Sequence, residues 1–474
     1  MSTLDSYETT PLLQVPAKKR TPLPWTQIIV LVLVQIAEPI TSQVIYPFIN
    51  KLIAELPITE GDETRVGYYA GLIESLFFVT EALTILQWSR WSDHVGRKPI
   101  LMIGLSGLTL SMLFFGISKS FEGLIISRCL AGLLNGNIGV LKSMMGELTD
   151  ETNIAQGMAL MPVTWSCGAT LGPVLGGWLA NPHERFPSIF GQSEFWREYP
   201  YALPCFVAAG YCAFAFLLTL FCLKETVEVG KPRDQTLVEE NALPTRSGEI
   251  PLSLKQILGY PRVVVVVVNY AFLAFLDIAF RALQPLVYTT SIPNGGLGLP
   301  PPSVGLALGA FGLASGLFQT FVFVYIYEWL GPKPIFRLSI STYLPMFILF
   351  PLMNLSAMHN GVNWLTWVEI AFQVSFYVLM DMGFCTINIY IRASAPSNRS
   401  LGATNGLSQT SASIARAIGP ALSNSLFAVS RQHNLLGGHL VYAVSAVVAG
   451  CAIVMTNYLP KDIWHQESTE SDSQ

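Results

Sequence analysis

Apolar segments of about 20 residues recur from one end of this chain to the other, and they limit its fold more than any other feature. A helix of that length crosses the ~30 Å hydrocarbon layer of a bilayer. Of the 474 residues, 51% are hydrophobic and only 12% are charged, which is well below the charged fraction of a typical soluble domain. The alternating pattern of membrane barrels is absent from the sequence. The sequence therefore predicts an all-α integral membrane protein.

The apolar segments predict twelve transmembrane helices in two sets of six. The first set lies near 25–49, 66–88, 99–117, 121–145, 155–180 and 200–223, and the second near 262–290, 303–327, 335–353, 363–391, 403–428 and 437–459. We expect two pseudo-symmetric six-helix halves, 25–223 and 262–460, joined by a polar cytoplasmic linker at 224–261. The ends, 1–24 and 461–474, are expected to be cytoplasmic tails, and the polar composition of the second predicts disorder.

Basic residues in the loops set the orientation, because cytoplasmic loops carry an excess of Lys and Arg. Most loop cations lie on one side if the N-terminus is inside, with Lys18, Lys19 and Arg20 ahead of the first span. Both ends are then cytoplasmic, which agrees with an even number of spans.

Internal echoes indicate that the two halves arose by duplication. "DHVGRKPI" (93–100) is echoed by "EWLGPKPI" (328–335), and "GATLGPVLGG" (168–177) by "RAIGPALSNS" (416–425). A weaker echo pairs Glu38 in the first span with Asp277 in the seventh. Two parallel repeats are the architecture of major facilitator transporters, in which the substrate binds between the halves.

These motifs resemble the major facilitator superfamily over residues 25 to 460. The loop at 89–98 matches its Gly-x-x-x-Asp-x-x-Gly-Arg-Lys/Arg signature except that Ser89 replaces the first glycine, and Arg128 matches its fourth-span arginine. "GATLGPVLGG" resembles the fifth-span motif of twelve-span drug:proton antiporters. Residues 402–428 resemble the fungal and plant branch that includes zinc-induced facilitator-like carriers.

The resemblance implies a cytoplasmic gating latch in which a loop carboxylate pairs with arginines at helix ends. Its residues here are Asp93, Gly96, Arg97 and Lys98, and in the second copy Glu328 and Lys333. The alternative is that these cations only anchor the topology of the chain, as loop cations do.

Charged residues inside the spans are few and costly, so each is a candidate for function. Those that we expect to couple protons or substrate are Glu38, Glu74, Arg128, Asp277 and Arg281, with Glu81 and Arg416 as further intramembrane charges. Glu38 is the first choice for the proton- or cation-binding group, with Arg128 adjusting it. Alternatively, Glu38 makes a structural hydrogen bond, Asp277 and Arg281 only neutralise each other, and Glu81 lies near the cytoplasmic end in solvent.

The fifth-span motif consists of Gly168, Gly172, Pro173, Gly176 and Gly177. Small residues permit close helix approach, and the proline predicts a kink. The resemblance implies a bend that discourages leak and favours antiport. Close packing without any part in coupling is the alternative.

Polar residues in the spans suggest a mid-sized, partly apolar organic substrate, and the surplus of acids favours a cationic one. The cavity candidates are Gln35, Gln43, Tyr46, Asn269, Gln284, Asn388 and Gln409. Ordinary hydrogen bonds between helices explain most of them individually as well. No histidine cluster supports a metal site, and we expect no cofactor and no nucleic-acid partner.

The sequence thus predicts a monomeric secondary transporter that exports a drug or secondary metabolite in exchange for protons. Uptake or facilitated diffusion of a nutrient by the same fold remains open, and so does a non-transporting membrane sensor or scaffold. An enzyme is disfavoured because no nucleophile–base pair appears. The tail sequence "ETTPLL" (8–13) resembles an acidic dileucine signal, which leaves plasma membrane and vacuolar or endosomal membranes as alternatives.

Overall fold

The computed structural model describes residues 21–149, 153–226, 256, 258–396 and 401–460, and in these residues the regular structure is helical. The spans of the first half are α1 (Trp25–Gln43), α3 (Val66–Val95), α4 (Arg97–Ile117), α5 with α6 (Phe121–Leu134 and Asn137–Leu148), α7 (Ile154–Leu179) and α11 (Ala202–Cys222). Those of the second are α14 (Pro261–Thr289), α15 with α16 (Pro301–Phe321 and Phe323–Leu330), α17 with α18 (Pro332–Ser341 and Tyr343–Asn360), α19 (Trp364–Ser394), α20 (Leu401–Gln432) and α21 (Leu440–Thr456). The twelve predicted spans are therefore present.

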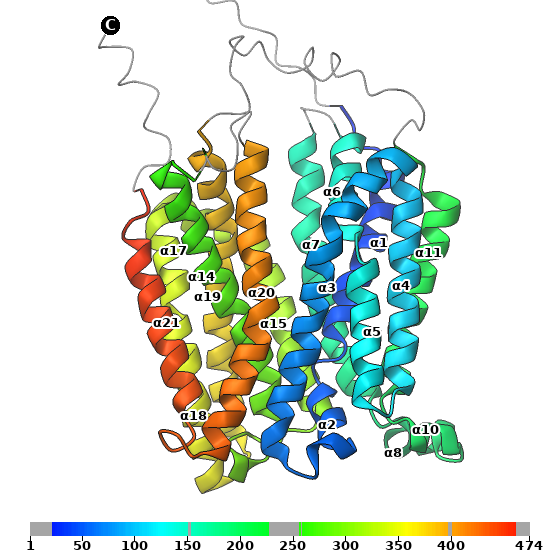
Figure 1. The fold of residues 1–474 in the computed structure, drawn as a ribbon, viewed down its shortest axis with the longest axis vertical. Coiled ribbons are helices and arrows are strands. Elements are labelled where there is room, and N and C mark those ends of the chain that lie inside the picture. Colours follow the sequence, from blue (N-terminus) through cyan, green and yellow to red (C-terminus); the bar gives the residue numbers. More distant parts are fainter. Residues whose placement is uncertain (1–20, 150–152, 227–255, 257, 397–400, 461–474) are drawn as a thin grey trace, which may run out of the picture.

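Figure 1 shows the two six-helix sets side by side, with the first half in blue to green and the second in green to red. Their internal contacts correspond: α1 packs on α7 as α14 packs on α20, and α4 packs on α11 as α17 and α18 pack on α21. We call the side where α3 and α19 end the inner side, following the orientation predicted from the basic residues.

The two halves meet through α3 with α20 and through α7 with α15, and these contacts gather toward the outer side. A Cβ atom at Gly67 of α3 would lie 2.5 Å from the carbonyl oxygen of Asn424 in α20. A Cβ atom at Gly305 of α15 would lie 2.3 Å from the carbonyl oxygen of Pro173 in α7. α3 and α20 then diverge toward their inner ends (Figure 1). The structure is thus closed on its outer side.

Several predicted spans are interrupted. The first helix ends at Gln43 and the chain resumes as the short α2 (Ile49–Ala54), whereas the sequence predicts one span to residue 49. The fourth span breaks at Asn135 and Gly136, and the eighth and ninth change helix near Val322 and Thr342. The apolar pattern gives the length of each span but not these breaks.

Short helices line the outer loops: η1 (Pro57–Thr59), η2 (Glu63–Arg65), α8 (Pro182–Arg185), α9 (Pro187–Phe190), α10 (Glu194–Glu198) and η3 (Ile292–Asn294). The predicted tail at 461–474, the "ETTPLL" sequence and most of the predicted linker lie outside the described residues.

Candidate transport site

The first-half acids predicted to carry the coupling lie close to Arg128 in the middle of the bundle. Glu38 on α1, Glu74 on α3 and Arg128 on α5 are 8%, 2% and 5% exposed. The guanidinium of Arg128 lies over the ring of Phe77, with its carbon 4.7 Å from the ring centre. Burying ionised groups in a bundle is costly unless they compensate one another, so these charges act as one cluster.

Not every polar atom of this cluster is satisfied. Oε2 of Glu74 and Nε of Arg128 have no hydrogen-bond partner among the described residues. Glu38, Thr41, Ser42, Ser111 and Arg128 line a cavity of about 10 Å³ together with apolar side chains. That is roughly the space for one water molecule. A buried carboxylate and an incompletely bonded guanidinium at the edge of a small, mostly apolar cavity are an arrangement in which a proton or one water molecule can be bound.

Glu81 does not lie in solvent at the inner end of α3, as one of the alternatives supposed. It is half-buried, and its Oε1 accepts a hydrogen bond from Nδ2 of Asn135 at 2.9 Å. Asn135 also lies within hydrogen-bonding reach of Glu38. The break in the fourth span therefore joins two acids from two other helices.

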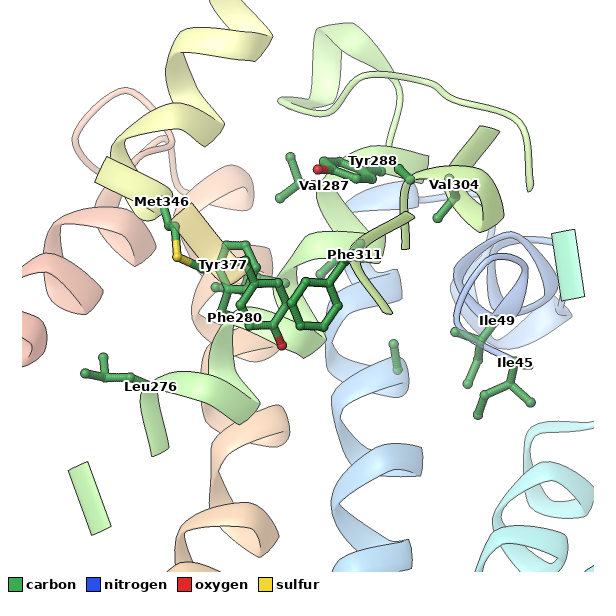
Figure 2. Close-up of a cluster of buried hydrophobic side chains, with 14 of the residues drawn as sticks. Ile45, Ile49, Leu276, Phe280, Val287, Tyr288, Val304, Phe311, Met346 and Tyr377 are labelled. Atoms are coloured by element: carbon green, nitrogen blue, oxygen red, sulfur yellow. The ribbon is translucent and has the colours of Figure 1, made fainter. Parts of the chain in front are cut away.

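The second half contains its own charged cluster. Nε of Arg281 donates to both carboxylate oxygens of Asp277 at 3.0 Å, so the predicted pair forms. The hydroxyl of Tyr377 donates to Asp277 at 3.1 Å. Figure 2 shows the ring of Tyr377 between Phe280 and Phe311, where it stacks on Phe311 with 3.8 Å between ring centres. This rigid setting agrees with the interpretation of Asp277 and Arg281 as an internally neutralised pair.

Asp381 on α19 belongs to this cluster, although the sequence analysis did not single it out. The hydroxyl of Ser315 on α15 donates to its carboxylate, and Arg281 is near enough to act on it electrostatically. Lys142 on α6 was missed as well and acts on Glu38 in the same way. Both are charges inside predicted spans, so the cost of intramembrane charge was a sufficient signal to find them.

At the inner surface, Arg97 and Lys98 bind partners within the first half and at the start of the linker. Arg97 forms an ion pair with Glu147 at the end of α6, with 3.0 Å between Nη2 and Oε1. The carboxylate of Glu225 accepts the backbone N–H groups of Arg97 and Lys98 at 2.9 and 3.0 Å, which caps the start of α4. Gly96 has a φ of 108°, which favours glycine. The side chain of Asp93 lies outside what the structure describes.

In the second copy of the loop, the lysine is bound within its own half. Glu328 is exposed, whereas Nζ of Lys333 donates to the carbonyl oxygens of Asn457 and Leu459 at 2.7 and 2.5 Å. The described contacts therefore fix each loop to its own half in this outer-closed state. The latch between halves stays a prediction.

The glycines of the fifth-span motif face two different helices. Cβ atoms at Gly168, Gly172 and Gly176 would collide with Pro39, Gln43 and Val44 of the first span and the residues after it. A Cβ atom at Gly177 would instead lie 2.3 Å from the carbonyl oxygen of Pro301 in the other half. α7 runs through Pro173 as one helix. The motif thus provides close packing between helices. A part of the motif in coupling stays a prediction.

The cavity candidates separate into two groups. Gln35, Gln43 and Tyr46 lie on or just after α1, and Tyr46 is near Glu74 and Arg128, while Asn388 and Gln409 are exposed on α19 and α20. Asn269 and Gln284, each 1% exposed, instead bind Met455 and Tyr288 within the second half. Both fit the packing interpretation, because Asn269 reaches from α14 to α21, and Gln284 bonds within α14 to Tyr288, whose hydroxyl donates to Gln373 of α19.

Comparisons with known proteins agree with this fold. The family model described as Major Facilitator Superfamily matches residues 31–420. The efflux pump azaK of Aspergillus niger is 30% identical over 443 residues, which cover 92% of this chain and 89% of that protein. Protein ZINC INDUCED FACILITATOR-LIKE 1 of Arabidopsis thaliana is 29% identical, covering 89% and 88%.

Among solved structures, that of a D-xylose-proton symporter superposes with a TM-score of 0.68 at 13% identity, covering 93% of this chain and 99% of that one. At this identity the likeness concerns the fold alone. The matched family model spans far more than half of this chain, and the two relatives are matched over 89% and 88% of their own length. This multi-pass membrane protein, a transporter rather than an enzyme, belongs to the Major Facilitator Superfamily.

Proposed function

We propose that the protein exports a small organic compound, a drug or secondary metabolite, in exchange for protons. The observation that carries the proposal is the buried carboxylate of Glu38 at a small, mostly apolar cavity beside Arg128. A carboxylate in such a place takes or releases a proton when its surroundings change, since burial favours its neutral form and a neighbouring cation its charged form. The similarity to a fungal efflux pump supports export.

In this mechanism, the coupling depends on whether Glu38 is accessible from the inner or the outer side of the membrane. With the outer side closed, Glu38 releases its proton inward, and its negative charge favours binding of a cationic or polar substrate. When the halves rock and the site meets the outside, a new proton neutralises Glu38 and weakens that binding. The substrate then leaves outward. Transport by rocking of two halves around a fixed site is the mechanism expected of this architecture.

The experiment is uptake of rhodamine 6G and of a neutral fluorescent coumarin into inside-out vesicles, with and without an acidic interior. We expect gradient-driven accumulation by the unchanged protein. Glu38→Gln should reduce it to the level seen without a gradient, because the amide cannot release a proton. Glu122→Gln is the matched control, since it makes the same change at an exposed carboxylate on α5. Equal transport with and without the gradient would exclude exchange for protons and favour facilitated diffusion.

A further inference from the structure

We propose that the proton carried by Glu38 is shared with a second carboxylate, Glu81, through the side-chain amide of Asn135 at the break in the fourth span. The idea rests on the proposed function for the purpose of the proton, but the pairing itself can be tested without transport. Glu81 would then be a further coupling residue, and Asn135 the positioning residue that holds the two acids together.

The geometry of the break supports the pairing. α5 ends at Leu134 and α6 begins at Asn137, so Asn135 stands between two helices in mid-span. Its side chain is 1% exposed, and its Nδ2 carries two N–H donors, one toward Glu81 at 2.9 Å and one available to Glu38. Its Oδ1 has no partner among the described residues. A buried amide with an unused acceptor can also accept a hydrogen bond from the O–H of a neutral carboxyl group.

Glu81 is held at this point by the packing of α3 on the break. A broken helix leaves carbonyl groups that need partners inside a membrane. The side chain of Trp88 donates to the carbonyl oxygen of Leu133 at 2.7 Å, and the hydroxyl of Thr84 donates to the carbonyl oxygen of Gly132 at 3.4 Å. A Cβ atom at Gly136 would lie 2.4 Å from Cβ of Trp88, so only glycine allows this approach. Glu81 lies on the same face of α3 as these two side chains.

The charges around the pair come from three helices. Lys142 of α6 acts on Glu38, Arg128 of α5 acts on Glu81, and Arg416 of α20 acts on both. Arg128 is also shared with Glu74. Two neighbouring carboxylates disfavour double ionisation. The steps in which they lose their protons then belong to the pair and not to either residue alone. Because Arg416 belongs to the other half, rocking of the halves changes its distance from the pair and thereby the affinity of the pair for a proton.

If Glu81 had only a structural role, its carboxyl group would titrate independently of Glu38. Glutamine can still accept the hydrogen bond from Asn135 but cannot titrate. Glu81→Gln therefore preserves the break in the fourth span while removing one carboxylate from the pair. Thr84→Val is the matched control, because it removes a contact to the same break without changing a charge.

The experiment is an infrared titration of carboxyl bands in the purified full-length protein in lipid nanodiscs. We expect Glu38→Gln to shift the mid-point of the band assigned to Glu81 by about one pH unit or more, toward lower pH, because a like charge beside Glu81 is removed. Glu81→Gln identifies the Glu81 band by removing it, and Thr84→Val should leave that band unchanged. An unmoved Glu81 band in folded Glu38→Gln protein overturns the pairing. Glu38→Ala, which removes the same charge, decides the question if Glu38→Gln does not fold.

The two proposals fail separately. A shift in the infrared titration together with gradient-independent transport would leave the pair standing and remove the proposed exchange. Gradient-driven transport with an unmoved titration would keep the exchange and assign the proton to Glu38 alone.

Discussion

Two lysine residues at corresponding places in the echoed sequence have a structural role within their own halves. Lys98 opens α4, and its Nζ donates to the carbonyl oxygen of Leu220 near the end of α11 at 2.8 Å. Lys333 stands at the same place in the second half and binds carbonyl oxygens at the end of α21. A cation at a helix C-terminus satisfies carbonyl groups that have no partner within the helix. Each lysine therefore ties the third span of its half to the sixth.

Replacing Lys333 tests this role. Lys333→Met should lower the free energy of unfolding by about 1 kcal/mol, since a partly exposed charged donor to two carbonyl groups is lost. The measurement is thermal unfolding in detergent. Lys333→Arg should retain most of the stability, and Arg337→Met should retain all of it, because Arg337 is exposed one turn further along α17. Equal melting temperatures for Lys333→Met and the unchanged protein would contradict the structural role.

At the level of helices, glycines decide how closely the two halves approach. α7 and α15 cross between the halves, and Gly305 and Gly312 of α15 leave room for the backbone of α7 at Pro173 and Ala169. Because backbone atoms cannot move aside as a flexible side chain can, even a methyl group there pushes the helices apart. If the two halves separate at the outer side, this contact must open.

Gly305→Ala should therefore favour opening of the outer side. Overpacking of this kind costs about 1 to 3 kcal/mol, which lowers the ratio of closed to open molecules by about fivefold to more than a hundredfold. The reporter is Ser75→Cys, which lies in the buried contact between α3 and α20 and should react faster with a membrane-impermeant maleimide from outside. Gly210→Ala is the control, since its methyl group would meet open space. Unchanged labelling in Gly305→Ala would show that the contact does not limit opening.

For the whole molecule, a polar contact at the outer surface closes the two halves. Glu63 of the first half accepts hydrogen bonds from Ser291 and Asn294 of the second at 2.5 and 3.0 Å. Tyr68 of α3 donates to Gln432 of α20 at 3.0 Å. Glu63 also lines an outer cavity of about 320 Å³ between the halves. Since the rocking motion must separate these groups, their strength sets part of the balance between the two states.

Glu63→Ala should increase the outer-open population severalfold. The measurement is the distance distribution between spin labels at Ile189→Cys and Asn360→Cys, in protein whose exposed native cysteines are replaced by serine. Glu60→Asn is the control, because the ion pair of Glu60 is with Arg65 of its own half and asparagine tolerates its φ of 53°. A distribution that is identical in Glu63→Ala and the unchanged protein would rule out this contact as an outer gate.

Much of the fold and part of the site could be predicted from the sequence. The twelve spans follow from the apolar segments, because each must cover the hydrocarbon layer with side chains and satisfy its own backbone. The acids near Arg128 could be found because an intramembrane charge is costly wherever it stands. Glu81 was left with two alternatives, since its depth depends on where α3 packs rather than on its neighbours in sequence.

The sequence by itself determined that this chain crosses the membrane many times in two related halves and buries a few charges. These properties depend on local composition and on repeats along the chain. Only the tertiary structure decided that the fourth span breaks at Asn135, because side chains of α3 supply the missing hydrogen bonds there. It also decided that Arg416 of one half faces acids of the other, which no local pattern contains.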